Sequence, residues 1–171
     1  MSRLSIEPGV SVGIIKIGMS RFEVEDCIRE YTLKLDKDNV DRIFENFIMP
    51  EYDEEGHLIS LTVATQITHH VHCYINDCDV FKTKANKLIK QIEQISPYIK
   101  NSESLAGYNY VFPEIGLAFY RSRALTEEDL VTAWFKAQSV ENQKDEMQFL
   151  YFESVMITSK DYFEFMKQTK V

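Results

Sequence analysis

The alternation of strand-like and helix-like segments constrains the fold of this chain more than any other feature of its 171 residues. Two successive stretches each run strand, capped helix, strand, tight turn ending in glycine, and strand. The expected helix N-caps, Ser20 and Thr83, are 63 residues apart, and the turn glycines, Gly56 and Gly116, are 60 apart. Few residues are identical between the two stretches, so the repeat is one of pattern. A chance alternation within an ordinary α+β chain is the alternative.

The repeat predicts an α+β fold in which two tandem β-α-β-β units form one antiparallel sheet, with the helices packed on one face. The two halves span residues 10–66 and 71–157. We expect a single domain over residues 1–171, because domains typically hold about 100–150 residues. The second face of such a sheet would be left for a partner or for another copy of the chain.

Local motifs support the first unit. Ser20 and Glu23 have the spacing of a capping box, in which each side chain accepts an N–H that the helix end leaves unpaired. A helix over 20–35 places five apolar side chains on one stripe: Val24, Cys27, Ile28, Tyr31 and Leu35. We expect a strand at 12–17 before this helix and a β-hairpin at 42–66 after it, with a positive φ at Gly56.

The second unit follows from the same kinds of pattern. We expect a strand at 71–75 and a helix at 83–96, which Pro97 ends. A hairpin at 108–121 would turn at Gly116.

The remaining chain departs from the repeat. Thr126 and the acids after it indicate the start of a helix that continues to residue 135. The polar stretch 138–146 indicates a loop. The run 147–157 has apolar residues on both faces, which is typical of a central strand, and a helix at 160–170 would end the chain.

Charge and hydrophobicity exclude some functional classes. The chain has 27 acidic and 19 basic residues, a net charge of −8, which argues against a nucleic-acid binder or a cationic membrane-surface protein. No stretch approaches the ~18 apolar residues of a membrane span, and the N-terminus lacks the apolar core of a signal peptide. We therefore expect a cytoplasmic protein with three reduced thiols, Cys27, Cys73 and Cys78.

Acidic side chains are concentrated in the expected turns. Exposed carboxylates in turns can meet a basic partner without disturbing a sheet. Six residues are predicted to contact a protein partner: Asp53, Glu54, Glu55, Glu127, Glu128 and Asp129. The alternative is that these charges only keep the protein soluble.

Few residues indicate chemistry. His70 and His72 would share one face of a strand and could hold a zinc ion together, but zinc requires three or four converging ligands. Cys73 would point to the opposite face. The sequence has no Gly-x-Ser-x-Gly elbow and no phosphate-binding glycine loop. We therefore predict no catalytic residue, no metal site and no cofactor.

One segment carries a resemblance. The residues Val12-Gly-Ile-Ile-Lys-Ile-Gly-Met-Ser-Arg-Phe-Glu-Val-Glu25 resemble the start of the strand–helix–hairpin modules in bacterial β-lactamase-inhibitor-like proteins. The pieces 52–56 and 112–121 are similar to small bacterial toxin-immunity proteins. This chain lacks the lipobox cysteine of the related lipoproteins, and it carries an inserted segment at 122–146.

The resemblance implies a function by binding, with no catalytic residue to carry over. We therefore expect a cytoplasmic bacterial immunity or inhibitor protein that neutralises a toxin, with a basic toxin domain as the partner, by stoichiometric protein–protein binding. One alternative is a small metal-binding protein or enzyme that uses the His70/His72 region. Another is a homo-oligomeric module, such as a homodimer, without a ligand.

Overall fold

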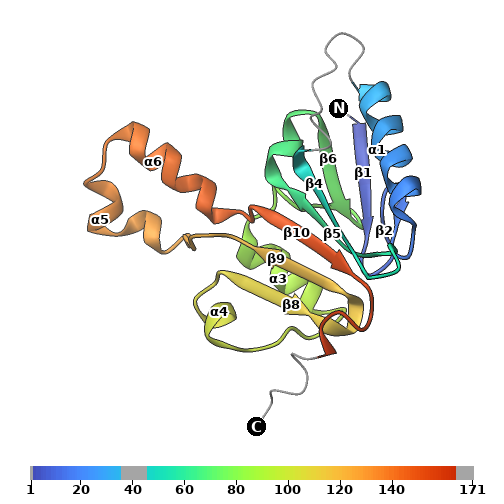
Figure 1. Ribbon diagram of the computed structural model, residues 1–171. Helices are drawn as coiled ribbons and strands as arrows, with labels where there is room; N and C mark the ends of the chain where they lie inside the picture. Colours follow the sequence, from blue (N-terminus) through green and yellow to red (C-terminus); the bar gives the residue numbers. More distant parts are fainter. Residues whose placement is uncertain (1, 36–45, 165–171) are drawn as a thin grey trace.

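The structure is a computed structural model that describes residues 2–35 and 46–164 (Figure 1). Within these residues the strands form two five-stranded sheets. The first sheet has the order β3-β2-β1-β6-β7, with strands β1 (Ser2–Glu7), β2 (Ser11–Val12), β3 (Ile15–Lys16), β6 (Val71–Ile75) and β7 (Cys78–Asp79). The second has the order β4-β5-β10-β9-β8, with strands β4 (Ile48–Tyr52), β5 (Leu58–Ala64), β8 (Asn109–Phe112), β9 (Leu117–Tyr120) and β10 (Ser154–Thr158).

The second sheet confirms the two expected hairpins. The pairs β4–β5 and β8–β9 are antiparallel, and both hairpins lie in this one sheet. Strand β10 joins them, because it pairs antiparallel with β5 on one side and with β9 on the other. The prediction of a central strand near the C-terminus is therefore also confirmed, although its residues are only Ser154–Thr158.

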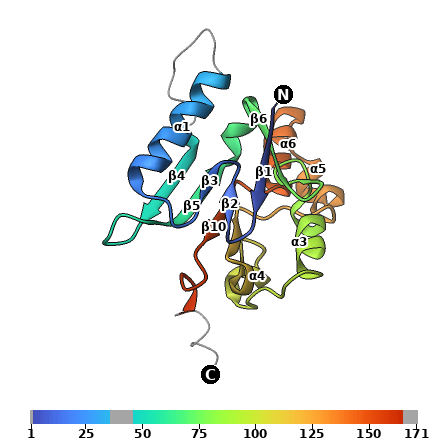
Figure 2. The ribbon, with the colours of Figure 1, turned by 90° about the vertical axis from the view of Figure 1, so that its right-hand side faces the viewer.

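The prediction of one antiparallel sheet is wrong, although the α+β class is correct. The strands expected to open the two units, at 12–17 and 71–75, correspond to residues of the first sheet. In that sheet β6 pairs in parallel with β1. The segment 12–17 is not one strand, because Gly13 takes a φ of 57° and Val12 pairs back with Ile15. With two sheets present, the helices do not share one face. In Figures 1 and 2, β1 lies between the long N-terminal helix and the helix that follows β7.

Strand β1 itself was not predicted. Its side chains alternate, with Leu4 and Ile6 buried and Arg3, Ser5 and Glu7 exposed. This period of two is a strand pattern that the sequence does contain.

Five α-helices are described: α1 (Arg21–Leu35), α3 (Ala85–Glu93), α4 (Ser102–Leu105), α5 (Ala133–Lys136) and α6 (Val140–Met147). Helix α1 confirms the capping box, since the Ser20 N–H donates to a Glu23 carboxylate oxygen at 2.8 Å and the Glu23 N–H donates to the Ser20 hydroxyl at 3.4 Å. Helix α3 is also confirmed, but its N-cap is Lys84 and not Thr83.

The C-terminal third differs from its prediction. The stretch 138–146 is not a loop, because α6 begins after Ser139, whose hydroxyl accepts the N–H of Asn142. The sequence of α6 lacks the apolar stripe by which a helix is usually recognised, and none of its residues is buried. Most of the expected helix at 160–170 lies outside the described residues.

The main core contains an aromatic group beneath the β8–β9 hairpin. Phe112 and Phe119 meet edge to face with ring centroids 6.1 Å apart, and Phe119 stacks on Phe152 at 5.0 Å. All three side chains are fully or almost fully buried. Most of the apolar side chains of both sheets, α1 and α3 belong to this same core, which fixes the sheets as a rigid base for the segment between β9 and β10.

Candidate functional site

The segment 122–153, between β9 and β10, extends away from both sheets (Figure 1). We call it the arm; it contains α5, α6 and the short 3-10 turn Asp129–Val131. Three buried side chains, Leu125, Phe135 and Leu150, form a small cluster that is separate from the main core. The arm therefore has its own apolar packing and projects as an ordered unit.

A buried arginine anchors the base of the arm. Arg121 is only 4% exposed, and its guanidinium donates to the carbonyls of Gly107 at 2.7 Å, Leu125 at 3.2 Å and Phe149 at 2.7 Å. Leu125 and Phe149 lie on the outgoing and returning segments of the arm, so one side chain ties both to the body. Burial lowers the pKa of this guanidinium, but the group stays charged at neutral pH.

A second arginine organises the arm above its base. Arg123 lies over the rings of Trp134 and Phe149, at 5.5 and 5.7 Å from their centroids. Its guanidinium also donates to a carboxylate oxygen of Glu146 at 2.7 Å. Contacts between a guanidinium and aromatic rings are favourable, so Arg123 holds Trp134 of α5 and Glu146 of α6 in fixed positions.

The arm exposes large apolar side chains. Trp134, the only tryptophan of the chain, is 50% exposed. Three more apolar residues of the arm are exposed: Val131, Val140 and Met147. Tryptophan is the residue type most enriched at the energetic centres of protein interfaces, which makes this surface a candidate for partner binding.

The predicted acidic residues of the arm have different environments. Glu127 forms an ion pair with Lys84, at the start of α3, and this contact lowers the pKa of the Glu127 carboxyl. Asp129 accepts the backbone N–H of Thr126 at 2.7 Å, which lowers its pKa as well. Glu128 is exposed, and its carboxylate forms neither an ion pair nor a hydrogen bond with another described residue. It is therefore the member of this group most available to a partner.

The other predicted acids lie in the β4–β5 turn, far from the arm in both views (Figures 1 and 2). Asp53 accepts the N–H groups of His57 at 2.8 Å and Glu55 at 3.0 Å, and the bond from His57 does most to lower its pKa. Glu54 and Glu55 are exposed. The structure therefore brings Glu127, Glu128 and Asp129 together but does not bring them to Asp53, Glu54 and Glu55.

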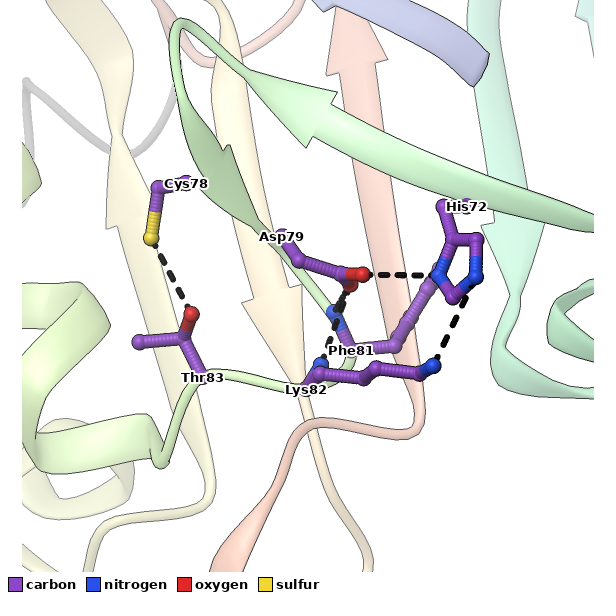
Figure 3. Close-up of polar contacts among 6 residues, drawn as sticks. All are labelled: His72, Cys78, Asp79, Phe81, Lys82 and Thr83. Carbon is purple, nitrogen blue, oxygen red and sulfur yellow. Dashed lines mark hydrogen bonds and ion pairs between the residues drawn. The ribbon is translucent and has the colours of Figure 1, made fainter. Parts of the chain in front are cut away.

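The histidines do not form the expected pair. His70 follows a 3-10 turn (Thr65–His69) and precedes β6, so it does not share a strand face with His72. His72 instead contacts Asp79 of β7 through Nδ1 at 2.9 Å, and its Nε2 lies 3.5 Å from the Lys82 amine (Figure 3). Asp79 also accepts the N–H groups of Phe81 and Lys82. In the described parts of the chain, no three His, Cys, Asp or Glu residues are grouped so that they could hold a metal ion.

All three cysteines are free thiols, as predicted. Burial raises the pKa of the Cys73 thiol to about 12, so at pH 8 on the order of one molecule in 10⁴ carries a thiolate there. We expect iodoacetamide at pH 8 to leave Cys73 unmodified in the folded protein and to alkylate it once urea unfolds the chain. Peptide mapping by mass spectrometry measures this, and alkylation of folded Cys73 at the rate of the unfolded chain would contradict it.

No helix in the described segments has the length and apolar character needed to cross a bilayer. No protein family, curated protein or solved structure matches this chain. The candidate site consequently depends on the geometry of the arm.

The sequence did not reveal the exposed apolar surface of the arm. Trp134 lies among apolar residues that predict a buried helix face, yet only Phe135 of α5 is buried. A short helix that packs on a few residues buries one side chain and leaves its neighbours exposed. The signals present in the sequence were the insertion at 122–146 and the single tryptophan within it.

Proposed function

We propose that this protein is an immunity or inhibitor protein of the cytoplasm that binds a basic protein partner stoichiometrically through its arm. The single observation that carries the proposal is the projecting arm with half-exposed Trp134 at its surface. Exposed apolar side chains on a projecting element are a cost to a soluble monomer unless a partner covers them.

Charge indicates the chemistry of the partner. Within the arm, Arg123, Lys136 and Lys144 are the only basic residues. Seven residues are acidic: Glu127, Glu128, Asp129, Glu141, Asp145, Glu146 and Glu153. A basic surface with an apolar pocket for Trp134 is complementary to this arrangement, and opposite charges accelerate association and exclude acidic competitors.

The test is a titration of the chain with the proteins encoded by the neighbouring genes, measured by calorimetry and by stopped-flow fluorescence. We expect a 1:1 complex. Trp134→Ala should weaken binding by about 30-fold or more, because truncated tryptophans at interface centres typically cost ~2 kcal/mol or more. Glu128→Lys should slow association, and the effect should shrink with added salt.

Matched controls lie on α1. Phe22→Ala removes an aromatic side chain that is 69% exposed, and Glu25→Lys reverses an exposed charge. Neither change should alter binding.

A further pair of variants separates the two acidic regions. If Glu54→Lys and Glu55→Lys slow association while the arm variants bind normally, the interface is at the β4–β5 turn and the arm proposal is wrong. Catalytic turnover by the isolated protein, or binding without salt dependence, would also contradict the proposed function.

A further inference from the structure

A groove runs along one side of α3, beside the β6–β7 hairpin. Two cavities of about 360 Å³ each lie end to end there. Both are lined by Ile75 and Asn76 of the β6–β7 hairpin and by Ile92 and Ile95 at the end of α3. Because they share these walls, we treat them as one site, the α3 groove. Each cavity falls at the lower end of the range of ~300–1,000 Å³ that small-molecule pockets occupy.

One end of the α3 groove is apolar. Pro8 and Val10 of the β1–β2 turn line it together with Ile95 and with Ile115, which precedes β9. Val10 is 45% exposed and Ile95 is 59% exposed. A ligand that covered these side chains would remove apolar surface from water, which is favourable in proportion to the area covered.

The other end of the α3 groove is polar. Its lining includes Thr83, Lys87 and Gln91 together with Cys78 of β7. The Cys78 sulfur lies 3.2 Å from the Thr83 hydroxyl oxygen and 3.0 Å from the Gln91 side-chain oxygen. Since a thiol has one proton, it bonds one of these oxygens at a time, which leaves hydrogen-bonding capacity for a polar ligand group.

The polar end is lined by two carboxylates, each with a contact of its own, and by one lysine. Asp79 is engaged by His72 at 2.9 Å, and Asp77 lies 3.4 Å from Arg3. Lys87 is exposed and forms no ion pair with any described residue. A carboxylate placed at this end would therefore find a cation that lacks a counter-charge.

The wall between the two ends is held in place by its own contacts. Asn76 has a φ of 53°, and within the described residues it is the only non-glycine with a positive φ. Its carbonyl accepts a 2.6 Å hydrogen bond from Arg3. Strained backbone of this kind persists where the surrounding structure fixes it, so the shared wall is preformed.

We propose that the α3 groove binds a small amphipathic carboxylate. The apolar chain of the ligand lies over Ile95 and Val10, and its carboxylate meets Lys87, with Thr83 and Gln91 beside it. At the far end, Lys160 also lines the apolar cavity, where its long side chain can keep its charge in water. The polar end adjoins the base of the arm, since Thr83 and Lys87 also line a cavity with Glu127 and Tyr151. The proposal does not rest on the proposed protein partner.

The test uses decanoate as the probe, with decylamine and decanol as charge controls, in calorimetric and NMR titrations of the full chain. We expect decanoate to bind at least about tenfold more tightly than decylamine. Lys87→Gln should abolish the preference of the groove for decanoate over decanol. Ile95→Ser should weaken decanoate binding by about tenfold, since it removes most of an apolar contact.

Exposed matched variants guard against a change in folding. Lys90 lies about one turn further along α3, outside the groove lining. The Lys90→Gln variant should therefore bind decanoate as tightly as the unchanged protein does. Leu33→Ser removes a 67% exposed leucine from α1 and should also have no effect. The proposal is overturned if no decanoate binds at millimolar concentration. It is also overturned if decylamine binds equally well, or if Ile95→Ser and Leu33→Ser behave alike.

Discussion

Replacing Arg121 with methionine is expected to lower the free energy of unfolding by about 3 kcal/mol. The change keeps an unbranched apolar chain in the buried site but removes the guanidinium that serves the carbonyls of Gly107, Leu125 and Phe149. A buried acceptor that loses its donor costs ~1–3 kcal/mol. The gain from no longer burying a charge offsets part of that cost. Urea unfolding followed by circular dichroism measures the difference.

Arg123→Met is the matched control, because Arg123 lies two residues further along and about half of its side chain is exposed. Partly exposed ion pairs and guanidinium–ring contacts each contribute little, so the loss there should be smaller, about 1 kcal/mol. Limited proteolysis adds a local readout, since Arg121→Met should speed cleavage within the arm before it speeds cleavage elsewhere. Equal stability losses for the two variants would mean that Arg121 does not anchor the arm.

The sequence predicted those parts of the fold that local interactions determine. Helix α1 begins directly after Ser20 because the capping box and the apolar stripe are both encoded within 20–35. The two hairpins were recognisable because their strands pair across short turns with a glycine at a positive φ. These features need no knowledge of distant residues.

The division into two sheets could not be predicted in the same way. The parallel pairing of β1 with β6 joins Ser2 to Val71, and no local pattern specifies a partner at that separation. The sequence is equally compatible with Gly13 beside a strand and with Gly13 inside a turn. Only the folded chain shows that this glycine reverses the backbone between β2 and β3.

The candidate site was predicted only in part, for a related reason. Acidic residues at 127–129 were correctly placed near a helical segment, but charge alone does not reveal that Glu127 pairs with Lys84. The availability of Trp134 depends on how few side chains pack around α5. Both properties arise from tertiary packing, which single-residue patterns do not encode.

Gly116→Ala is expected to destabilise the protein by about 3 kcal/mol, whereas Gly56→Ala should cost only about 1 kcal/mol. Both glycines end the turn of a predicted hairpin and both have a positive φ, 57° at Gly116 and 86° at Gly56. An L-residue in that region costs roughly 1–2 kcal/mol, and this term applies to both variants. The difference arises from what the new methyl group would meet. A carbon added to Gly56 would meet no atom within 4 Å apart from its neighbours in the chain, but at Gly116 the added carbon would lie 2.4 Å from the backbone oxygen of Thr158.

The contact at Gly116 cannot be relieved by rotating a side chain, because its partner is backbone of β10. Thr158 also donates its N–H to the Gly116 carbonyl at 2.9 Å, so moving the oxygen away disturbs the pairing of β10 beside β9. Since β10 joins the two hairpins, the strain should spread through the second sheet and reduce the cooperativity of urea unfolding as well as its midpoint. If Gly116→Ala and Gly56→Ala lower the midpoint equally, β10 does not approach the turn as closely as the structure places it, and the central position of β10 between the hairpins would need revision.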